Sequence, residues 1–275
     1  MCKLMACVGV PFSLRTIKHF YDKFSRGNPH AAGYALYHDG SVLLGKQPGV
    51  GTALFDRDKE LIENTLPQTT LGLFHVRFAT HGHPSDNKNN HPIYHSMNSK
   101  VKSMIIHNGM VSVDKNLPSD GQTDTEQLLC YWDEEGPECL NKFSGNAAIV
   151  VISNGKLYVY RHHAPLFFKQ TDSGIYFHQD YEYKGKTVPE DIVFEVSLSA
   201  GLTPVLKTSM KKPLYWSQQM SCQSASPLVK AKEFWNSYKD EDDDDGSDNE
   251  LGIESWEDLC KRYGLSEKEQ MFNEE

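Results

Sequence analysis

The sequence lacks long apolar runs, and this absence excludes several classes of protein. No stretch of the 275 residues approaches the ~20 consecutive apolar residues that a membrane-spanning helix needs. The N-terminus has no basic segment followed by an apolar one, so we expect no secretory signal peptide. No basic stripe suggests a face that binds nucleic acid. We therefore expect a globular protein that interacts with neither membranes nor nucleic acids.

Cysteine is scarce, and its spacing shows no framework. The chain has no C-x-x-C pair, and its six cysteines are widely scattered: Cys2, Cys7, Cys130, Cys139, Cys222 and Cys260. This pattern favours reduced thiols in a cytosol over a disulfide scaffold. We expect Cys7, Cys130 and Cys139 to be buried packing residues.

Positive charge is scarce only near the C-terminus. The net charge is −9, and residues 232–275 hold 16 of the 37 acidic residues but five of the 28 basic ones. Residues 240–248 form an acidic run that we expect to be solvated and disordered, with docking of a partner as the alternative role. We therefore expect one catalytic domain at 2–216 and a low-order acidic tail at 217–275, with a short helix near 255–265.

The hydrophobic pattern predicts many strands and a few helices, which is typical of an α+β fold. Two hairpin turns are predicted, at Asp39-Gly40 and Asn154-Gly155. The expected strands cover residues 4–10, 34–44, 72–78, 104–106, 147–152, 156–161, 166–169, 174–178 and 192–196. The expected helices cover 14–24 after a Ser13 cap, 59–64, and Thr123 to about Trp132, whereas residues 82–99 are expected to form a loop.

Cys2 can act as a nucleophile that carries its own base. If Met1 is removed, Cys2 becomes the N-terminal residue, and its free α-amine can take the proton of its thiol. That amine titrates near pH ~8, close to the pH at which a good general base operates. N-terminal threonine nucleophiles use the same pairing of nucleophile and amine.

Other residues supply what acyl transfer from an amino acid requires. An Asn side chain beside a Gly N–H, as at Asn108-Gly109, suits a tetrahedral oxyanion. The guanidinium of Arg77 can hold a carboxylate by two hydrogen bonds, and Asp124 can hold an ammonium group. Each signal has a structural alternative: Thr123-x-x-Glu126 matches a helix capping box, Asn108-Gly109 a plain turn, and Arg77 a structural ion pair.

Taken in order, these motifs resemble the class II glutamine amidotransferases, N-terminal-nucleophile hydrolases that free ammonia from glutamine. The motifs are Cys2, residues 75–82, Asn90-His91-Pro92, His107-Asn108-Gly109 and residues 123–126, and the likeness covers roughly residues 2–200. It implies a four-layer αββα sandwich. It also implies that Cys2 is the nucleophile, that Asn108 and Gly109 form the oxyanion hole, and that glutamine is held by Arg77, Phe78, Thr80, His81 and Asp124.

The chain also departs from the family pattern. It begins Cys2-Lys3-Leu4, nearer to a branch of stand-alone γ-glutamyl hydrolases of ergothioneine synthesis and glutathione breakdown. Residues 29–33 read Pro-His-Ala-Ala-Gly where an Asp is usual at the second position, and Phe78 stands where a Trp often follows the arginine. These departures bear on the substrate and the acceptor more than on hydrolysis.

Clustered histidines suggest a metal site as an alternative. Six of them fall within 33 residues: His75, His81, His83, His91, His95 and His107. No H-E-x-x-H motif or neighbouring cysteine pair accompanies them, and alternate residues of a strand face opposite sides. We therefore expect no bound metal and no organic cofactor.

Three functions remain open. The first is hydrolysis of the glutamine side-chain amide through a Cys2 thioester, with ammonia passing to a separate synthetase or acceptor subunit, because no acceptor domain is recognisable after residue 217. The second is a hydrolase of γ-glutamyl peptides or amides. The third is an inactive binding or scaffold module, against which the presence of Cys2, Arg77, Asn108 and Asp124 argues.

Overall fold

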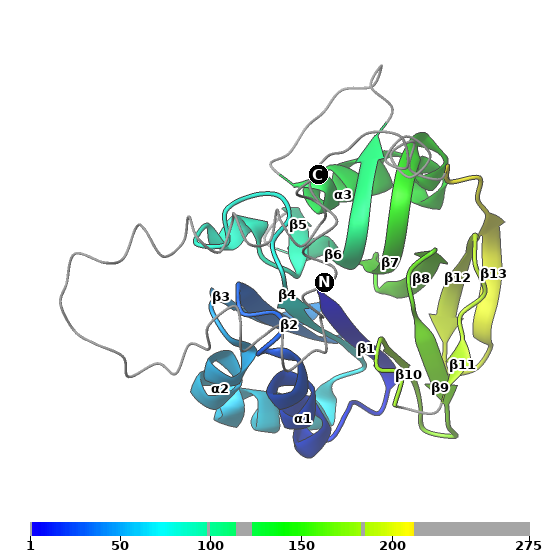
Figure 1. The fold of residues 1–275 in the computed structure, drawn as a ribbon. Coiled ribbons are helices and arrows are strands. Elements are labelled where there is room, and N and C mark those ends of the chain that lie inside the picture. Colours follow the sequence, from blue (N-terminus) through cyan, green and yellow to red (C-terminus); the bar gives the residue numbers. More distant parts are fainter. Residues whose placement is uncertain (1, 98–99, 114–122, 183–184, 212–275) are drawn as a thin grey trace, which may run out of the picture. The chain divides into compact units, whose positions relative to one another are not determined.

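The computed structural model describes residues 2–97, 100–113, 123–182 and 185–211 (Figure 1). The chain divides after Pro213, and its second part, Leu214–Glu275, lies outside the described residues. The acidic run at 240–248 and the helix expected near 255–265 therefore also fall outside them. No helix of the described part is long and apolar enough to cross a membrane.

Two antiparallel sheets form the body of the protein (Figure 1). The first sheet has seven strands in the order β11-β9-β10-β1-β4-β2-β3, namely Lys186–Thr187, Phe167–Gln170, Gly174–His178, Lys3–Gly9, Leu71–Arg77, Ala31–His38 and Ser41–Pro48. The second has six in the order β13-β12-β8-β7-β6-β5, namely Gly201–Lys207, Ile192–Ser197, Lys156–His162, Phe143–Ser153, Lys100–Val113 and Ile93–Met97.

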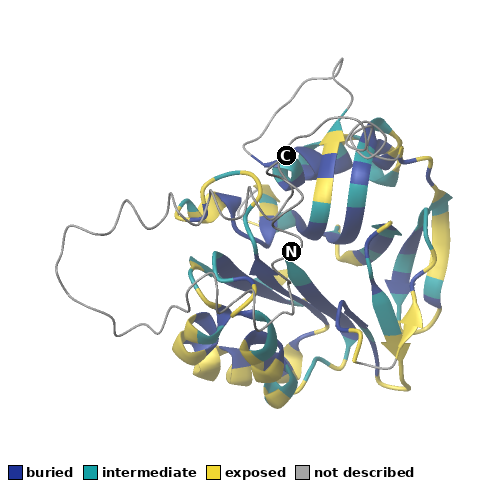
Figure 2. Cartoon of the chain, viewed as in Figure 1, coloured by how far each residue is buried: buried dark blue, intermediate teal, exposed yellow. Residues whose placement is uncertain are grey.

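Three apolar clusters define four layers. One cluster joins the facing sides of the two sheets, with β1 residues such as Leu4 and Ala6 against β6 and β7 residues such as Met104 and Val150. A second packs the outer face of the first sheet against helices α1 (Leu14–Phe24) and α2 (Gly51–Thr65). The third packs the outer face of the second sheet against α3 (Asp124–Glu135). Figure 2 shows the buried strands beside α1 and α2, whose outer sides are exposed. The αββα sandwich is thus confirmed.

Local signals account for most elements. The Ser13 side chain accepts a hydrogen bond from the Thr16 N–H and caps α1, and Thr123 caps α3 through the Glu126 N–H. Both predicted hairpin turns are present, because Asp39-Gly40 and Asn154-Gly155 have the positive φ angles that such turns need. Short 3-10 turns complete the fold at Leu66–Gln68, Asn87–Asn89 and Gly136–Lys142.

Several predictions were wrong in extent. The strand expected at 104–106 to end in a His-Asn-Gly turn continues through that motif to Val113. Helix α2 begins at Gly51 rather than at residue 59, and the loop expected over 82–99 contains strand β5. Strand β13 was not predicted, because Pro204 interrupts its pattern and it lies at a sheet edge. Cys7 and Cys139 are buried as expected, but Cys130 is only partly buried.

Candidate active site

Cys2 lies at the start of β1, where pairing with β4 fixes its position. Lys3 is opposite Val76, so Cys2 sits beside the end of β4. The Phe78 N–H donates to the Cys2 Sγ at 3.2 Å, and the thiol reaches the Phe78 carbonyl oxygen at 3.4 Å. The backbone after β4 therefore orients the sulfur atom.

Burial sets the protonation state of this thiol. Desolvation raises the pKa of the Cys2 thiol, and the negative charge of Asp124 raises it further. The hydrogen bond from the Phe78 N–H and the positive charge of Arg77 lower this pKa but do not cancel the rise. A thiol in this environment stays protonated at neutral pH. It therefore needs a nearby base before it can attack a carbonyl.

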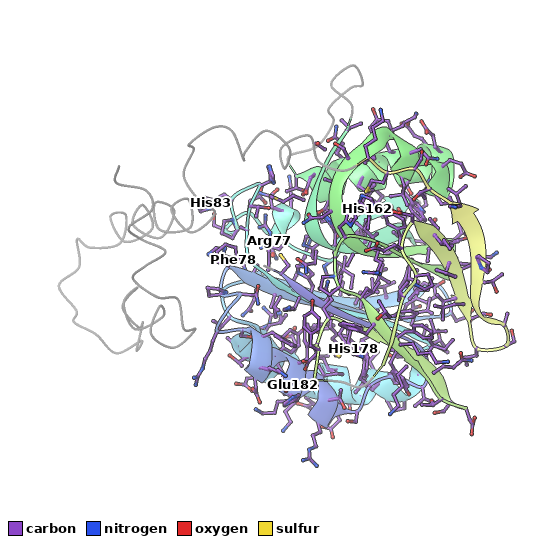
Figure 3. All side chains as sticks on the ribbon, turned by 45° about the vertical axis from the view of Figure 1, so that its right-hand side comes forward. Arg77, Phe78, His83, His162, His178 and Glu182 are labelled. Carbon is purple, nitrogen blue, oxygen red and sulfur yellow. The ribbon has the colours of Figure 1, made fainter. Side chains whose placement is uncertain are left out.

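Arg77 ends β4 and is buried, and its guanidinium organises the loop that follows. Its Nη1 donates to the Asn90 Oδ1 at 2.8 Å, and its Nη2 donates to the Gly82 carbonyl at 3.0 Å and to the His81 carbonyl. Figure 3 labels Arg77 next to Phe78 at this end of the sheet. Arg77 therefore shapes the segment that carries Thr80 and His81, which are both exposed and lie within 3.3 Å of each other (His81 Nδ1 to Thr80 Oγ1).

Asn108 lies in β6 and is oriented by a residue that the sequence did not single out. Its Nδ2 donates to the Oε1 of Gln179 at 2.9 Å. The same oxygen accepts the Leu4 N–H at 3.2 Å, and the Gln179 Nε2 donates to the Pro165 carbonyl at 2.7 Å. Because one partner is a backbone donor and the other a backbone acceptor, the two ends of the Gln179 amide are fixed. Asn108 must therefore present its NH₂ group to Gln179, which leaves a second N–H on the same nitrogen.

Gly109 needs to be glycine for a steric reason. Its φ is +138°, and a Cβ atom built there would lie 2.0 Å from the Asn146 carbonyl oxygen of β7. The close approach of β6 to β7 therefore leaves no room for a side chain at this point. The Asn-Gly dipeptide, which suggested a turn, serves here as an irregular point inside a strand.

Asp124 opens α3 and connects that helix to β6. Its Oδ2 accepts the Val111 N–H at 3.2 Å, and its Oδ1 accepts the Thr125 N–H at 2.9 Å. The N-terminus of a helix also favours a negative charge. The Thr123 N-cap and the predicted carboxylate thus occur together, because Thr123 caps the helix while Asp124 remains at the cleft.

Three buried histidines lie behind the cleft around Thr125. The Thr125 Oγ1 is 3.1 Å from both the His91 Nε2 and the His107 Nδ1, and the His75 Nε2 is 3.1 Å from the His107 carbonyl. Burial lowers the pKa of all three imidazoles, that of His75 to about 3. They are therefore neutral and act as hydrogen-bonding packing residues. No group of three or more metal-ligating side chains is arranged around a common point in the described residues.

One cleft brings most of the predicted residues together. It is lined by Cys2, Arg77, Phe78, Thr80, His81, Gly109 and Asp124, together with Asn89, His91, His107, Thr123 and Thr125. Asn108 is the one predicted residue outside this lining. A larger groove of about 950 Å³ lies against α1, β1 and β10 and holds none of the predicted residues, although Gln179 forms part of its wall. The chemistry of the lining therefore points to the smaller cleft.

His30 stands where the resembling family usually has an Asp, and its side chain makes two contacts beside the cleft. The His30 Nδ1 accepts the Ala79 N–H at 2.8 Å, and its ring packs against Phe78 at a tilt of 35°, with centroids 4.6 Å apart. Burial and the charge of Arg77 lower the pKa of His30 to about 4, so the nitrogen keeps the lone pair that this bond needs. A carboxylate could accept the same N–H, so either side chain is chemically suited to this backbone contact.

Comparison with known proteins gives sequence relatives and structural neighbours but no family model: no such model matches the chain. The chain is 28% identical over 148 residues to the isomerizing glutamine–fructose-6-phosphate aminotransferase of Streptomyces coelicolor, and 32% identical over 142 residues to that of Corynebacterium diphtheriae. These matches cover 50% and 46% of the chain but 23% and 22% of the relatives, so the chain spans less than a quarter of their length.

Two solved structures share the fold. Glutamine phosphoribosylpyrophosphate amidotransferase from B. subtilis, complexed with ADP and GMP, aligns with a TM-score of 0.58 at 14% identity over 74% of this chain and 49% of its own. A structure described as the allosteric regulatory enzyme of purine biosynthesis aligns at 0.62 and 16% identity over 76% and 50%. The relatives lend no support to the γ-glutamyl hydrolase branch suggested by Cys2-Lys3-Leu4. The chain has the fold of the class II, N-terminal-nucleophile amidotransferases, and its sequence is similar to part of the glutamine–fructose-6-phosphate aminotransferases.

Proposed function

We propose that the chain hydrolyses the side-chain amide of glutamine through a γ-glutamyl thioester on Cys2 and releases glutamate and ammonia. The observation that carries this proposal is the shared cleft. It joins a partly buried, backbone-held thiol to Arg77, Asp124 and Gly109, which come from three different strands and helices.

The first half-reaction begins with the α-amine that Cys2 gains when Met1 is removed. The amine takes the thiol proton, and the thiolate attacks the amide carbon of glutamine. The carbonyl oxygen becomes an oxyanion, which accepts the second N–H of the Asn108 amide and the Gly109 N–H. Gln179 is a positioning residue in this step, because its Oε1 accepts from the Asn108 Nδ2 and so fixes the orientation of the Asn108 amide.

The second half-reaction restores the enzyme. The protonated amine gives its proton to the departing nitrogen, ammonia leaves, and the γ-glutamyl group remains on the sulfur as a thioester. Water, deprotonated by the same amine, then attacks the thioester and releases glutamate. Neither step requires a metal or an organic cofactor.

The two charged ends of glutamine are assigned to opposite charges in the cleft. Asp124 holds the substrate ammonium, and Arg77 holds the carboxylate. Arg77 also binds the carbonyl groups of His81 and Gly82 and so positions the loop beside the carboxylate. Phe78, Thr80 and His81 complete the binding surface. We further propose that the ammonia passes to a separate acceptor or partner. We also propose that the protein is cytosolic.

The test is a comparison of three reactions of the full-length protein. Glutamate and ammonia should be released in equal amounts from glutamine, and the Cys2→Ala variant should lose this activity. A γ-glutamyl dipeptide should react much more slowly than glutamine. Faster turnover of the dipeptide would favour the γ-glutamyl hydrolase alternative, and absence of both activities in the correctly processed protein would favour an inactive binding module.

A further inference from the structure

A second cysteine, remote from Cys2 in the sequence, has the neighbours of a nucleophile. The Cys130 Sγ on α3 lies 4.0 Å from the Nε2 of His95 on β5. The opposite ring nitrogen, Nδ1, is 2.9 Å from the Oδ2 of Asp133, one turn further along α3. The Nζ of Lys102 lies 3.6 Å from the same carboxylate oxygen.

The contacts decide which ring nitrogen of His95 carries the proton. A carboxylate accepts hydrogen bonds, so the His95 Nδ1 donates to Asp133, and the tautomer that this bond selects has its lone pair on Nε2. That lone pair faces the Cys130 sulfur. Proteins activate a thiol by placing a base within its reach and a third group that orients the base. Cys130, His95 and Asp133 have this arrangement.

Exposure distinguishes Cys130 from Cys7 and Cys139. Cys7 and Cys139 are fully buried, and burial raises the pKa of the Cys7 thiol to about 12 and that of Cys139 further. Cys130 is partly buried, and the His95 side chain beside it is 33% exposed. A small molecule in solution can therefore reach this thiol and its base, whereas the other two thiols are inert.

We propose that Cys130 is a modification site that forms a mixed disulfide with low-molecular-weight disulfides. His95 Nε2 takes the thiol proton, and the Cys130 sulfur attacks one sulfur of the disulfide R–S–S–R. The bond between its two sulfurs breaks, a Cys130–S–S–R bond forms, and the departing R–S⁻ takes the proton from His95. One thiol is oxidised, one half of the external disulfide is reduced, and no further reactant is needed.

The position of Cys130 links this site to the cleft. It lies on α3, whose first turn carries Asp124 and Thr125, and beside β5, which follows His91. The Thr125 Oγ1 and the His91 Nε2 are 3.1 Å apart where these two elements meet behind the cleft. An adduct between α3 and β5 would separate them, and we expect it to weaken glutamine binding; this consequence rests on the proposed function.

The rate of disulfide formation tests the site. The full chain carrying Cys2→Ala would be treated with hydroxyethyl disulfide at pH 7, and the adduct at each cysteine would be followed by peptide mass spectrometry. Cys130 should react at least tenfold faster in the native protein than in the same protein unfolded in urea, while Cys7 and Cys139 stay unmodified in the native protein. Equal rates at Cys130 in the two states would overturn the proposal.

Two variants test whether His95 is the base. His95→Gln and Asp133→Asn should each slow the native reaction of Cys130 about tenfold or more, whereas His83→Gln, which removes an exposed histidine bonded to Ser85, should leave it unchanged. A reaction that is insensitive to His95→Gln would contradict the assignment. Calorimetry of glutamine binding to Cys2→Ala with and without the Cys130 adduct tests the link to the cleft separately, and unchanged affinity would refute that link but not the site.

Discussion

At the scale of single residues, the Asn108 amide depends on Gln179 for its orientation. Gln179→Met keeps the length of the side chain but removes both the acceptor for Asn108 and the donor to Pro165. We expect kcat to fall about tenfold with little change in KM, against about 10²–10³-fold for Asn108→Ala, because an oxyanion donor acts on the transition state.

A second readout separates this positioning role from a general loss of structure. Labelling of Cys2 by a glutamine-analogue electrophile should slow in Gln179→Met, while alkylation by iodoacetamide, which forms no oxyanion, should not. Thr208→Val, which removes a buried hydrogen bond to Tyr160 in the other sheet, is the matched control and should change neither rate. Equal slowing of both labels in Gln179→Met would mean that the residue is merely structural.

Arg77→Lys should act mainly on binding. An ammonium group donates from a single nitrogen, so it cannot reproduce the planar fork by which the two Nη atoms of Arg77 hold Asn90 and the carbonyl groups of His81 and Gly82. We expect KM for glutamine to rise at least tenfold while kcat changes less, as measured by steady-state glutamate release. A pure loss of kcat would contradict the role given to Arg77.

The candidate site residues could be predicted from the sequence, but Gln179, which orients Asn108, could not. Cys2, Arg77 and Asp124 could be predicted because their chemistry is specific and their motifs follow a known order. Gln179 could not, because it is separated from Asn108 by 71 positions and from Leu4 by 175, and a lone glutamine carries no signal. Its role exists only once β1, β6 and the segment after β10 have been brought together.

At the scale of elements, the neutral histidines on β4, β6 and the segment before β5 make stability depend on pH. In the unfolded chain each histidine titrates near pH ~6.5, whereas burial holds the folded pKa of His75 at about 3. Between these values the unfolded state binds a proton that the folded state does not, so the free energy of unfolding falls as pH falls. Over this range His75 contributes about 1.4 kcal/mol per pH unit.

Urea unfolding between pH 7.5 and 5 measures this effect. The wild-type protein should lose stability steeply below pH ~6.5, and His75→Asn should reduce the slope by about 1.4 kcal/mol per pH unit whatever it does to the absolute stability. The exposed His83→Asn provides the control and should leave the slope unchanged. An identical slope in wild type and His75→Asn would show that His75 is protonated in the folded state.

Elements were predictable where local signals agree with packing. The Ser13 cap and the helical spacing of apolar residues predicted the bounds of α1, and the turn dipeptides predicted the hairpins. The prediction failed at β6, because the Asn108-Gly109 dipeptide favours a turn while pairing with β7 over eleven residues holds the strand. It failed at the start of α2 because Val50 provides no side-chain cap there.

At the scale of the whole molecule, the layer order followed from the resemblance and not from the hydrophobic pattern, which gives strands but not their pairing. The sheet order β9-β10-β1-β4-β2 joins segments far apart in the chain, and periodicity alone carries no information on such contacts. The domain boundary stays a prediction, although the chain divides close to it, after Pro213.

Removal of residues 217–275 tests that boundary. Every residue assigned to the cleft precedes residue 130, and the described sheets end at Lys207. We therefore expect the truncated protein to hydrolyse glutamine within a few-fold of the rate of the full chain. We also expect it to lose basic partners that the full chain retains at low salt. The acidic tail would attract these partners electrostatically, and salt screens that attraction over ~10 Å at 0.1 M. A truncated protein that cannot fold or hydrolyse would show that the tail is part of the catalytic body.

The most direct test of the central claim, an N-terminal cysteine nucleophile, is the intact mass of the purified protein with and without a glutamine-analogue electrophile. We predict a mass lacking Met1, one adduct that peptide mapping assigns to Cys2, and no adduct in Cys2→Ala. Stable retention of Met1 in a fully active enzyme, or an adduct that persists in Cys2→Ala, would contradict the account.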